Sequence, residues 1–180
     1  LEPIRLRTSP HVRLIGCGTA LNACKIGQLA IESLARIPAT SHVASEFRYN
    51  DPVINPNAIH FAVSQSGETA DTLSAVKEIQ LKGGEVHGIV NVVGSTIARL
   101  CGQGVYIHSG PEQAVASTKA FTNMVGALLL FALRIGRTRS FSRERGRSII
   151  ADFEKIPELM EKYLAEPGPI DEAVEMVKNA

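Results

Sequence analysis

The chain alternates apolar segments with segments of helical period over most of its length. The segments that predict strands are short apolar runs bounded by turn residues, at residues 12–16, 40–44, 59–63, 86–93 and 105–108. Those that predict helices carry apolar residues every three or four positions, at residues 20–34, 72–82, 95–100 and 117–133. This alternation is typical of a parallel sheet with helices on both faces and right-handed crossovers. The pattern therefore predicts an α/β domain over residues 11–148, preceded by a lead-in at residues 1–10.

A basic run follows this domain pattern. Six arginines fall within residues 134–147, opposed only by Glu144. One interpretation is a patch for nucleic acid or an anionic ligand. We favour a solvated linker or a subunit contact, because Phe141 is the only aromatic residue among the arginines.

Residues 149–180 are predicted to form C-terminal helices and a linker toward a further domain. Pro157 is expected to kink or interrupt the first of these helices, and the linker is predicted at the Pro-Gly-Pro of residues 167–169. Because the chain begins at Leu1 and ends inside a helical pattern, we expect it to be a piece of a longer protein.

The most informative segment is Ser-Gln-Ser-Gly-Glu-Thr, residues 64–69, between a predicted strand and a predicted helix. The first N–H groups of a helix lack partners and carry the positive end of its dipole, which favours a bound anion. The hydroxyls of Ser64, Ser66 and Thr69 can donate to phosphate oxygens, and Gly67 lets the backbone approach closely. An ordinary Ser/Thr helix cap explains one hydroxyl better than three. From the residues alone, a phosphate site and a plain cap both stay open.

Two further turns are predicted at the same edge of the sheet, where the carboxyl ends of parallel strands meet and ligands bind. They are Gly-Cys-Gly-Thr at residues 16–19 and the segment 112–117, which leads into the most apolar helix. The hydroxyls that begin this helix either line the pocket or cap the helix, and Lys119 either neutralises a phosphate or projects outward. Glu46 and Glu112 also lie in loops near this edge and are candidates for touching a ligand hydroxyl. One loop carboxylate is weak evidence for acid/base chemistry.

Composition narrows the classes of function. The 180 residues suffice for one domain with a real core, and 44% hydrophobic with 21% charged residues is typical of a soluble globular protein. A net charge of +1 and only 5% aromatic residues disfavour nucleic acid and membrane surfaces as partners. The three cysteines have no C-x-x-C spacing, which favours a reducing cytoplasm over a zinc site or a disulfide framework. No signal peptide is visible, and the longest apolar run, residues 125–133, is too short to span a bilayer.

Several motif classes are disfavoured as well. Gly16 and Gly18 follow a strand, but Leu21 stands at the third glycine of a dinucleotide fingerprint, so we expect no nicotinamide cofactor. The G-x-x-x-x-G-K-[ST] pattern of an NTPase P-loop does not occur. The five histidines share no metal-ligand spacing, and His60 and His108, both in predicted strands, are expected to be core residues. We therefore expect neither a metal nor a cofactor.

Four segments together resemble a known family. They are residues 17–19, residues 44–49 (Ala-Ser-Glu-Phe-Arg-Tyr), residues 64–72 and residues 115–122 (Val-Ala-Ser-Thr-Lys-Ala-Phe-Thr). They are similar to the sugar isomerase (SIS) domain and, more narrowly, to the first of two such domains in the glucosamine-6-phosphate synthase (glutamine–fructose-6-phosphate aminotransferase) family. The similarity runs from about residue 12 to about residue 133. It implies a five-stranded parallel sheet flanked by helices, a flavodoxin-like three-layer sandwich.

The resemblance also implies which residues hold a ligand. The phosphate of fructose 6-phosphate or glucosamine 6-phosphate is expected at Ser64, Gln65, Ser66 and Thr69. The sugar chain is expected to contact Cys17, Gly18 and Thr19 together with Val115, Ala116 and Ser117. Two positions depart from the family: Ala20 replaces a usual Ser and loses one possible hydroxyl contact, and Ala114 replaces a usual Gly and crowds the loop slightly.

The resemblance finally implies what this chain lacks. In the family, a separate glutaminase domain with a cysteine nucleophile releases ammonia, and a Glu, a His and a Lys outside this segment carry out the isomerisation. We therefore expect no catalytic residue here, only the phosphosugar-binding half of an enzyme that makes glucosamine 6-phosphate and glutamate from fructose 6-phosphate and glutamine. The expected partners are the second SIS domain and glutaminase domain of the parent chain, and a second copy in a homodimer. The alternatives are a stand-alone SIS isomerase and a non-enzymatic module that senses phosphosugars.

Overall fold

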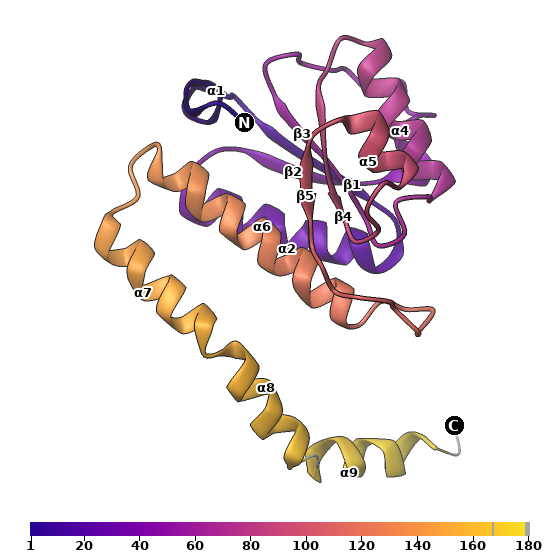
Figure 1. Cartoon of the computed structure of the whole chain (residues 1–180), viewed down its shortest axis with the longest axis vertical. Coiled ribbons are helices and arrows are strands. Elements are labelled where there is room, and N and C mark those ends of the chain that lie inside the picture. The colour runs from indigo at the N-terminus through magenta and orange to yellow at the C-terminus, as the bar shows by residue number, and fades with distance from the viewer. Residues whose placement is uncertain (167, 179–180) are drawn as a thin grey trace. The chain divides into compact units, whose positions relative to one another are not determined.

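The computed structural model describes residues 1–166 and 168–178, which divide into two compact units, Leu1–Phe141 and Ser142–Ala180. The elements of the first unit are, in chain order, α1 (Pro3–Thr8), β1 (Val12–Gly16), α2 (Gly18–Ala35), β2 (Ala39–Val43), α3 (Ala44–Phe47), β3 (Ile59–Ser64), α4 (Ala70–Leu81), β4 (Val86–Val90), α5 (Thr96–Cys101), β5 (Gly104–Tyr106) and α6 (Lys119–Arg137) (Figure 1). All five predicted strands are present, although β4 ends three residues before the end of its apolar run.

The five strands form one parallel sheet in the order β2-β1-β3-β4-β5. Helices α2 and α6 pack together on one face, while α3, α4 and α5 cover the other (Figure 1). The three-layer α/β prediction is therefore confirmed. The strand order reverses between β1 and β3, so the connections that leave these two neighbouring strands run to opposite faces. In open α/β sheets the crevice at such a reversal is where ligands bind.

Burial follows from this layering. Every residue of β3 and of β4 is buried, as expected for central parallel strands covered on both faces. On the face of α4, the core includes Ile15, Ala62, Val76, Ile79 and Ile97. Burying the side chain of each of the three isoleucines and of Val76 contributes roughly 1.5–3 kcal/mol. This core fixes where β1, β3 and β4 end, and hence where the turns that follow them lie.

The pair α2 and α6 depends on close backbone approach. A Cβ built on Gly27 of α2 would lie 2.7 Å from Cδ1 of Leu128 in α6, so a larger residue would force the two helices apart. By length and composition α6 is the one described helix that is apolar enough to cross a membrane, and 44% of that stretch is buried within the domain. The buried apolar residues of α6 pack against α2 and the sheet, where the ring of Phe131 lies 4.7 Å from that of Phe61, whereas Leu130 is exposed.

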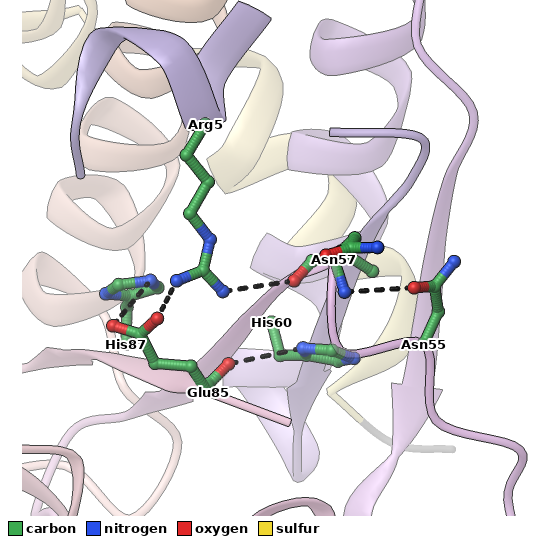
Figure 2. A network of polar contacts seen from close by, with 7 residues as sticks. Arg5, Asn55, Asn57, His60, Glu85 and His87 are labelled. Atoms are coloured by element: carbon green, nitrogen blue, oxygen red, sulfur yellow. Dashed lines mark hydrogen bonds and ion pairs between the residues drawn. The ribbon is translucent and has the colours of Figure 1, made fainter. Parts of the chain in front are cut away.

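The lead-in forms a helix that the periodicity did not predict. Helix α1 carries Pro3 in its first turn and buries Leu6. Arg5 donates to the carbonyl oxygen of Ala58 and pairs with Glu85, which precedes β4 (Figure 2). The segment is therefore tied to the edge of the sheet at which the strands begin.

Two histidines are buried beside this ion pair (Figure 2). His60 is fully buried in β3, and its Nδ1 donates to the carbonyl oxygen of Glu85 at 3.2 Å. His87 is 3% exposed in β4 and its ring lies 5.6 Å from that of Phe61. His60 is thus a core histidine, as expected, whereas His108 follows β5 instead of lying in it and is exposed.

The second unit contains α7 (Arg143–Glu154), α8 (Ile156–Ala165) and α9 (Gly168–Val177). Pro157 lies in the first turn of α8, so the predicted interruption is confirmed there. The predicted linker is wrong for Gly168 and Pro169, which begin α9, and Pro167 lies outside the described residues.

The basic run at residues 134–147 is divided between two helices and the segment that joins them. It spans the end of α6 and the start of α7. Arg137 donates to the carbonyl oxygen of Phe141, and Arg139 donates to that of Ser9 at 2.6 Å. At least these two arginines therefore make bonds within the first unit.

Acidification is expected to destabilise the first unit. Burial, followed by the charges of Arg13, His11 and Arg5, lowers the pKa of His60 to about 4. Burial is also the largest cause that lowers the pKa of His87 to about 4. The unfolded chain takes up these protons near pH 6.5, so stability is complete above that pH and is lost as the pH falls toward 4. One such shift corresponds to about 3 kcal/mol.

Urea unfolding at several pH values between 7 and 4 measures this loss. His60→Asn, which keeps a donor for the Glu85 carbonyl, should make the free energy of unfolding depend less steeply on pH. The same substitution at the exposed His108 is the matched control. An unchanged slope in His60→Asn would contradict the buried neutral state of His60.

Candidate functional site

The turn after β3 brings hydroxyl groups around the start of α4. The hydroxyl of Ser64 accepts from the N–H of Gly67 at 3.1 Å and lies 3.3 Å from that of Thr69. The hydroxyl of Ser66 accepts from the N–H of Glu68 at 3.2 Å. Because each hydroxyl that accepts a bond still has its own hydrogen, Ser64 and Ser66 can donate to a ligand. Gln65, Ser66 and Thr69 lie nearer the surface of this turn, whereas Ser64 is buried at the end of β3.

Helix α4 begins without a side-chain cap. Thr69 stands at the N-cap position, and its side chain accepts no hydrogen bond from the first turn. The first N–H groups of α4 therefore point into the turn with the positive end of the helix dipole behind them. This arrangement suits a bound anion, which is the interpretation that the sequence left open beside a plain cap.

The segment that leads into α5 packs against the turn at residues 64–69 and holds it in place. Gly67 has a left-handed φ of +67°, and a Cβ built on it would lie 2.0 Å from Oγ of Ser95. The carbonyl oxygen of Gly67 accepts from the N–H of Ile97, and the carboxylate of Glu68 accepts from the N–H of Thr96 at 2.8 Å. The turn therefore requires glycine at position 67 for its conformation and for the space that Ser95 fills.

The turn after β1 lies beside the same site. Cys17 is the N-cap of α2, and Gly18 follows it with a left-handed φ of 54°. The hydroxyl of Thr72 in α4 lies 3.9 Å from Sγ of Cys17 in a weak hydrogen bond. The turn that follows β1 is thus in contact with the first turn of α4. Ala20, where the resemblance implies a usual Ser, is buried in α2.

Cys17 differs from the other two thiols in its exposure. Burial raises the pKa of Cys24 to about 12 and that of Cys101 to about 11, and both are enclosed by the core. Cys17 is free and partly exposed, so it is the thiol that a ligand at this edge can reach.

The third turn, before α6, joins the other two. The hydroxyl of Thr19 accepts from the N–H of Ser117 at 3.3 Å, which connects residues 98 positions apart. Val115 and Ala116 are exposed in this turn, as is Ala114. All ten predicted site residues therefore lie in or directly beside three turns at one edge of the sheet, where Cys17 bonds with Thr72 in the first turn of α4 and Thr19 bonds with Ser117.

The two candidate carboxylates have different surroundings. Glu46, in α3, lies with Arg13, His42 and Phe47 around a cavity of about 300 Å³ that none of the ten predicted site residues lines. Glu112 instead accepts hydrogen bonds from the start of α6. Those bonds, with the one to the N–H of Ala120 as the largest cause, lower the pKa of Glu112 below its usual value. Neither carboxylate is therefore placed to act as a general base at the three turns, because Glu46 lines a separate cavity and Glu112 is bound to the start of α6.

Among the described residues, no cluster of three or more His, Cys, Asp or Glu side chains has the geometry of a metal site.

Comparison with known proteins shows the family to which this chain belongs. The SIS domain model matches residues 5–134. This chain belongs to the SIS domain family. The resemblance drawn from the motif residues is thereby confirmed.

Relatives of this SIS domain carry a common name. The glutamine–fructose-6-phosphate aminotransferase [isomerizing] of Chlorobaculum tepidum is 40% identical over 176 residues, 98% of this chain and 29% of that protein. An enzyme of the same name from Thermus thermophilus is 43% identical over 159 residues, 88% of this chain and 26% of that protein. The chain thus spans between a quarter and a third of the length of these relatives.

Solved structures agree with the fold. The C-terminal domain of glucosamine-fructose-6-phosphate aminotransferase from Francisella tularensis matches with a TM-score of 0.90 and 29% identity, over 98% of this chain and 51% of that chain. A glucosamine-6-phosphate deaminase from Thermotoga maritima matches with a TM-score of 0.68 and 22% identity, over 79% of this chain and 44% of that chain, which shows the fold alone.

Sequence reasoning missed the residues that support this SIS domain's turns. Ser95 and Thr96 meet the turn at residues 64–69 from a distant part of the chain, and Asn91 binds both the N–H of Ser109 and the carbonyl oxygen of Gly110. No local pattern marks these residues, because their partners lie on other segments. Only Glu68 could have been recognised from the sequence as a residue that supports a turn, because its carboxylate stands close to a predicted helix start.

Replacing Gly67 by Ala is expected to lower the free energy of unfolding by roughly 2 kcal/mol, through strain at positive φ and the contact with Ser95. Gly94→Ala is the matched control, because Gly94 has a φ of +71° and a Cβ built on it would meet no atom within 4 Å. Gly94→Ala should therefore lower the free energy of unfolding only by the strain at positive φ.

Urea unfolding of a double-mutant cycle separates the two contributions. Ser95→Gly removes the atoms nearest to position 67, so Gly67→Ala should cost at least about 1 kcal/mol less in that background. Strictly additive losses, or equal losses for Gly67→Ala and Gly94→Ala, would show that Ser95 does not restrict position 67.

Proposed function

We propose that this SIS domain binds a phosphorylated six-carbon sugar, with the phosphate at residues 64–69 and the sugar chain against residues 17–19 and 115–117. The observation that carries the proposal is the uncapped start of α4, surrounded by the hydroxyls of Ser64, Ser66 and Thr69. Helix α6 starts at the same edge, but there Glu112 already occupies the position of an anion. A phosphate is therefore directed to α4 and the uncharged end of the ligand to α6.

The proposed parent enzyme is a glutamine–fructose-6-phosphate aminotransferase, the name its relatives carry. In such an enzyme this domain would hold fructose 6-phosphate or glucosamine 6-phosphate by fixed hydroxyl and N–H groups while residues elsewhere move protons on the sugar. The second SIS domain and the glutaminase domain would be its partners within the parent chain. We further propose a homodimer and a cytoplasmic location, the latter supported by three free cysteines.

The two alternatives have less support. A stand-alone isomerase requires a Glu and a His of its own at the pocket, yet Glu112 is bound to α6, and Glu46 and His42 line a separate cavity. A regulatory sensor gains little from the basic run, since Arg137 and Arg139 bond to backbone carbonyls within the domain. We therefore keep the aminotransferase half as the proposed function.

Thr69→Val is expected to weaken the binding of glucosamine 6-phosphate by about 1–3 kcal/mol, because it removes a charge-assisted hydrogen bond to the phosphate. Isothermal titration calorimetry measures this change. Thr8→Val, at the end of α1 before β1, is the matched control and should bind as the original chain does. Unchanged affinity in Thr69→Val would count against a phosphate at this turn.

The purified chain is expected to bind phosphosugar without converting it, because Glu112 is bound to the start of α6 and Glu46 lines a separate cavity. Incubation with fructose 6-phosphate and an ammonium salt, followed by chromatographic detection of glucosamine 6-phosphate, tests this expectation. Product above the level of a protein-free control would favour the stand-alone isomerase.

A further inference from the structure

We propose that Glu112 is a positioning residue, whose carboxylate fixes the turn at residues 115–117 in the form that receives the sugar. This inference rests on the proposed function, because it assigns a task to one wall of the same site. It also replaces the expectation that Glu112 touches the ligand itself.

The carboxylate of Glu112 makes three contacts with the start of α6. Oε2 accepts from the N–H of Thr118 at 3.0 Å and from that of Ala120 at 3.2 Å. Oε1 accepts from the hydroxyl of Thr118 at 3.2 Å. Thr118 is the N-cap residue of α6, but its own side chain does not cap the helix. Glu112 therefore performs the capping from outside the helix, six residues upstream.

These contacts close a small loop over residues 113–117. Its ends are joined through Glu112 on one side and Thr118 on the other. Within it, Val115 has a relative exposure of 108%, and Ala114 and Ala116 are also exposed, so the loop has almost no apolar burial to hold its shape. A second polar anchor is the bond from the N–H of Ser117 to Thr19. A segment held by few buried groups depends on such anchors for its order.

The three contacts require a hydrogen-bond acceptor at position 112, and they involve no proton transfer by Glu112. A glutamine in the same rotamer presents one oxygen to the N–H groups of Thr118 and Ala120, and its NH₂ group can donate to the hydroxyl of Thr118. The neutral side chain therefore preserves the closed loop. An alanine leaves all three donors without this partner.

The test compares two ligands on the 180-residue chain by calorimetry, glucosamine 6-phosphate and inorganic phosphate. Glu112→Ala should weaken glucosamine 6-phosphate about five- to tenfold, the loss expected for one helix cap, and leave inorganic phosphate within about twofold. Glu112→Gln should restore the phosphosugar to within about threefold of the original chain. Gln113→Ala, a neighbour in the same loop, is the matched control.

Amide hydrogen exchange, followed by NMR, reports on the loop directly. The N–H groups of Thr118 and Ala120 should exchange faster in Glu112→Ala and at nearly the original rate in Glu112→Gln. Because Glu112→Gln keeps the loop closed, it also serves as the variant to interpret if Glu112→Ala folds poorly.

The outcomes separate this inference from the proposed function. Unchanged phosphosugar affinity in Glu112→Ala would overturn the positioning role alone. An equal loss of phosphosugar affinity in Glu112→Gln and Glu112→Ala would also overturn it, because the ligand would then depend on the negative charge of Glu112. A parallel loss of inorganic phosphate would overturn it too, by indicating damage to the whole edge. If the original chain bound no phosphosugar, the proposed function would fail first and the inference with it.

Discussion

The reversal of strand order between β1 and β3 is the constraint on which the rest of the site depends. Neighbouring parallel strands end at one edge, and here the helices that follow them leave toward opposite faces of the sheet. Two helix starts, those of α2 and α4, are thereby brought next to each other with their positive dipole ends facing one crevice. The contact between Thr72 and Cys17 is the direct sign of this proximity.

Two carboxylates hold helix starts at this edge. Glu68 binds the N–H of Thr96 and thereby attaches the turn at residues 64–69 to α5, while Glu112 closes the turn before α6. The start of α4 is left without such a partner. The same physical need, an acceptor for unpaired N–H groups at a helix start, is thus met from within the chain at α5 and α6, whereas α2 and α4 both begin without a side-chain cap beside the proposed ligand.

The opposite edge of the sheet has a different role. There the ion pair of Arg5 with Glu85 attaches the first helix to the beginnings of the central strands, and the buried rings of His60 and His87 lie against the same glutamate (Figure 2). The two ions are partly buried and the two rings are buried, yet all four stand at the opposite ends of the strands from the three turns. Polar residues at this edge therefore stabilise the fold, and those at the carboxyl edge form the candidate site.

Local patterns of apolar spacing, glycine and hydroxyl residues were enough to predict the alternation of strands and helices, the family and the three turns. The sequence predicted the burial of His60 but placed His108 in a strand, and it gave no sign of helix α1, which is held by Arg5 and Leu6 through long-range contacts. The same patterns gave no indication of what Glu112 binds, that Ser95 lies against Gly67, or that Thr19 and Ser117 meet; these contacts were visible in the folded chain alone. These are contacts between segments 6 to 98 residues apart, and their partners are chosen by the strand order and the packing of the helices rather than by any neighbouring residue.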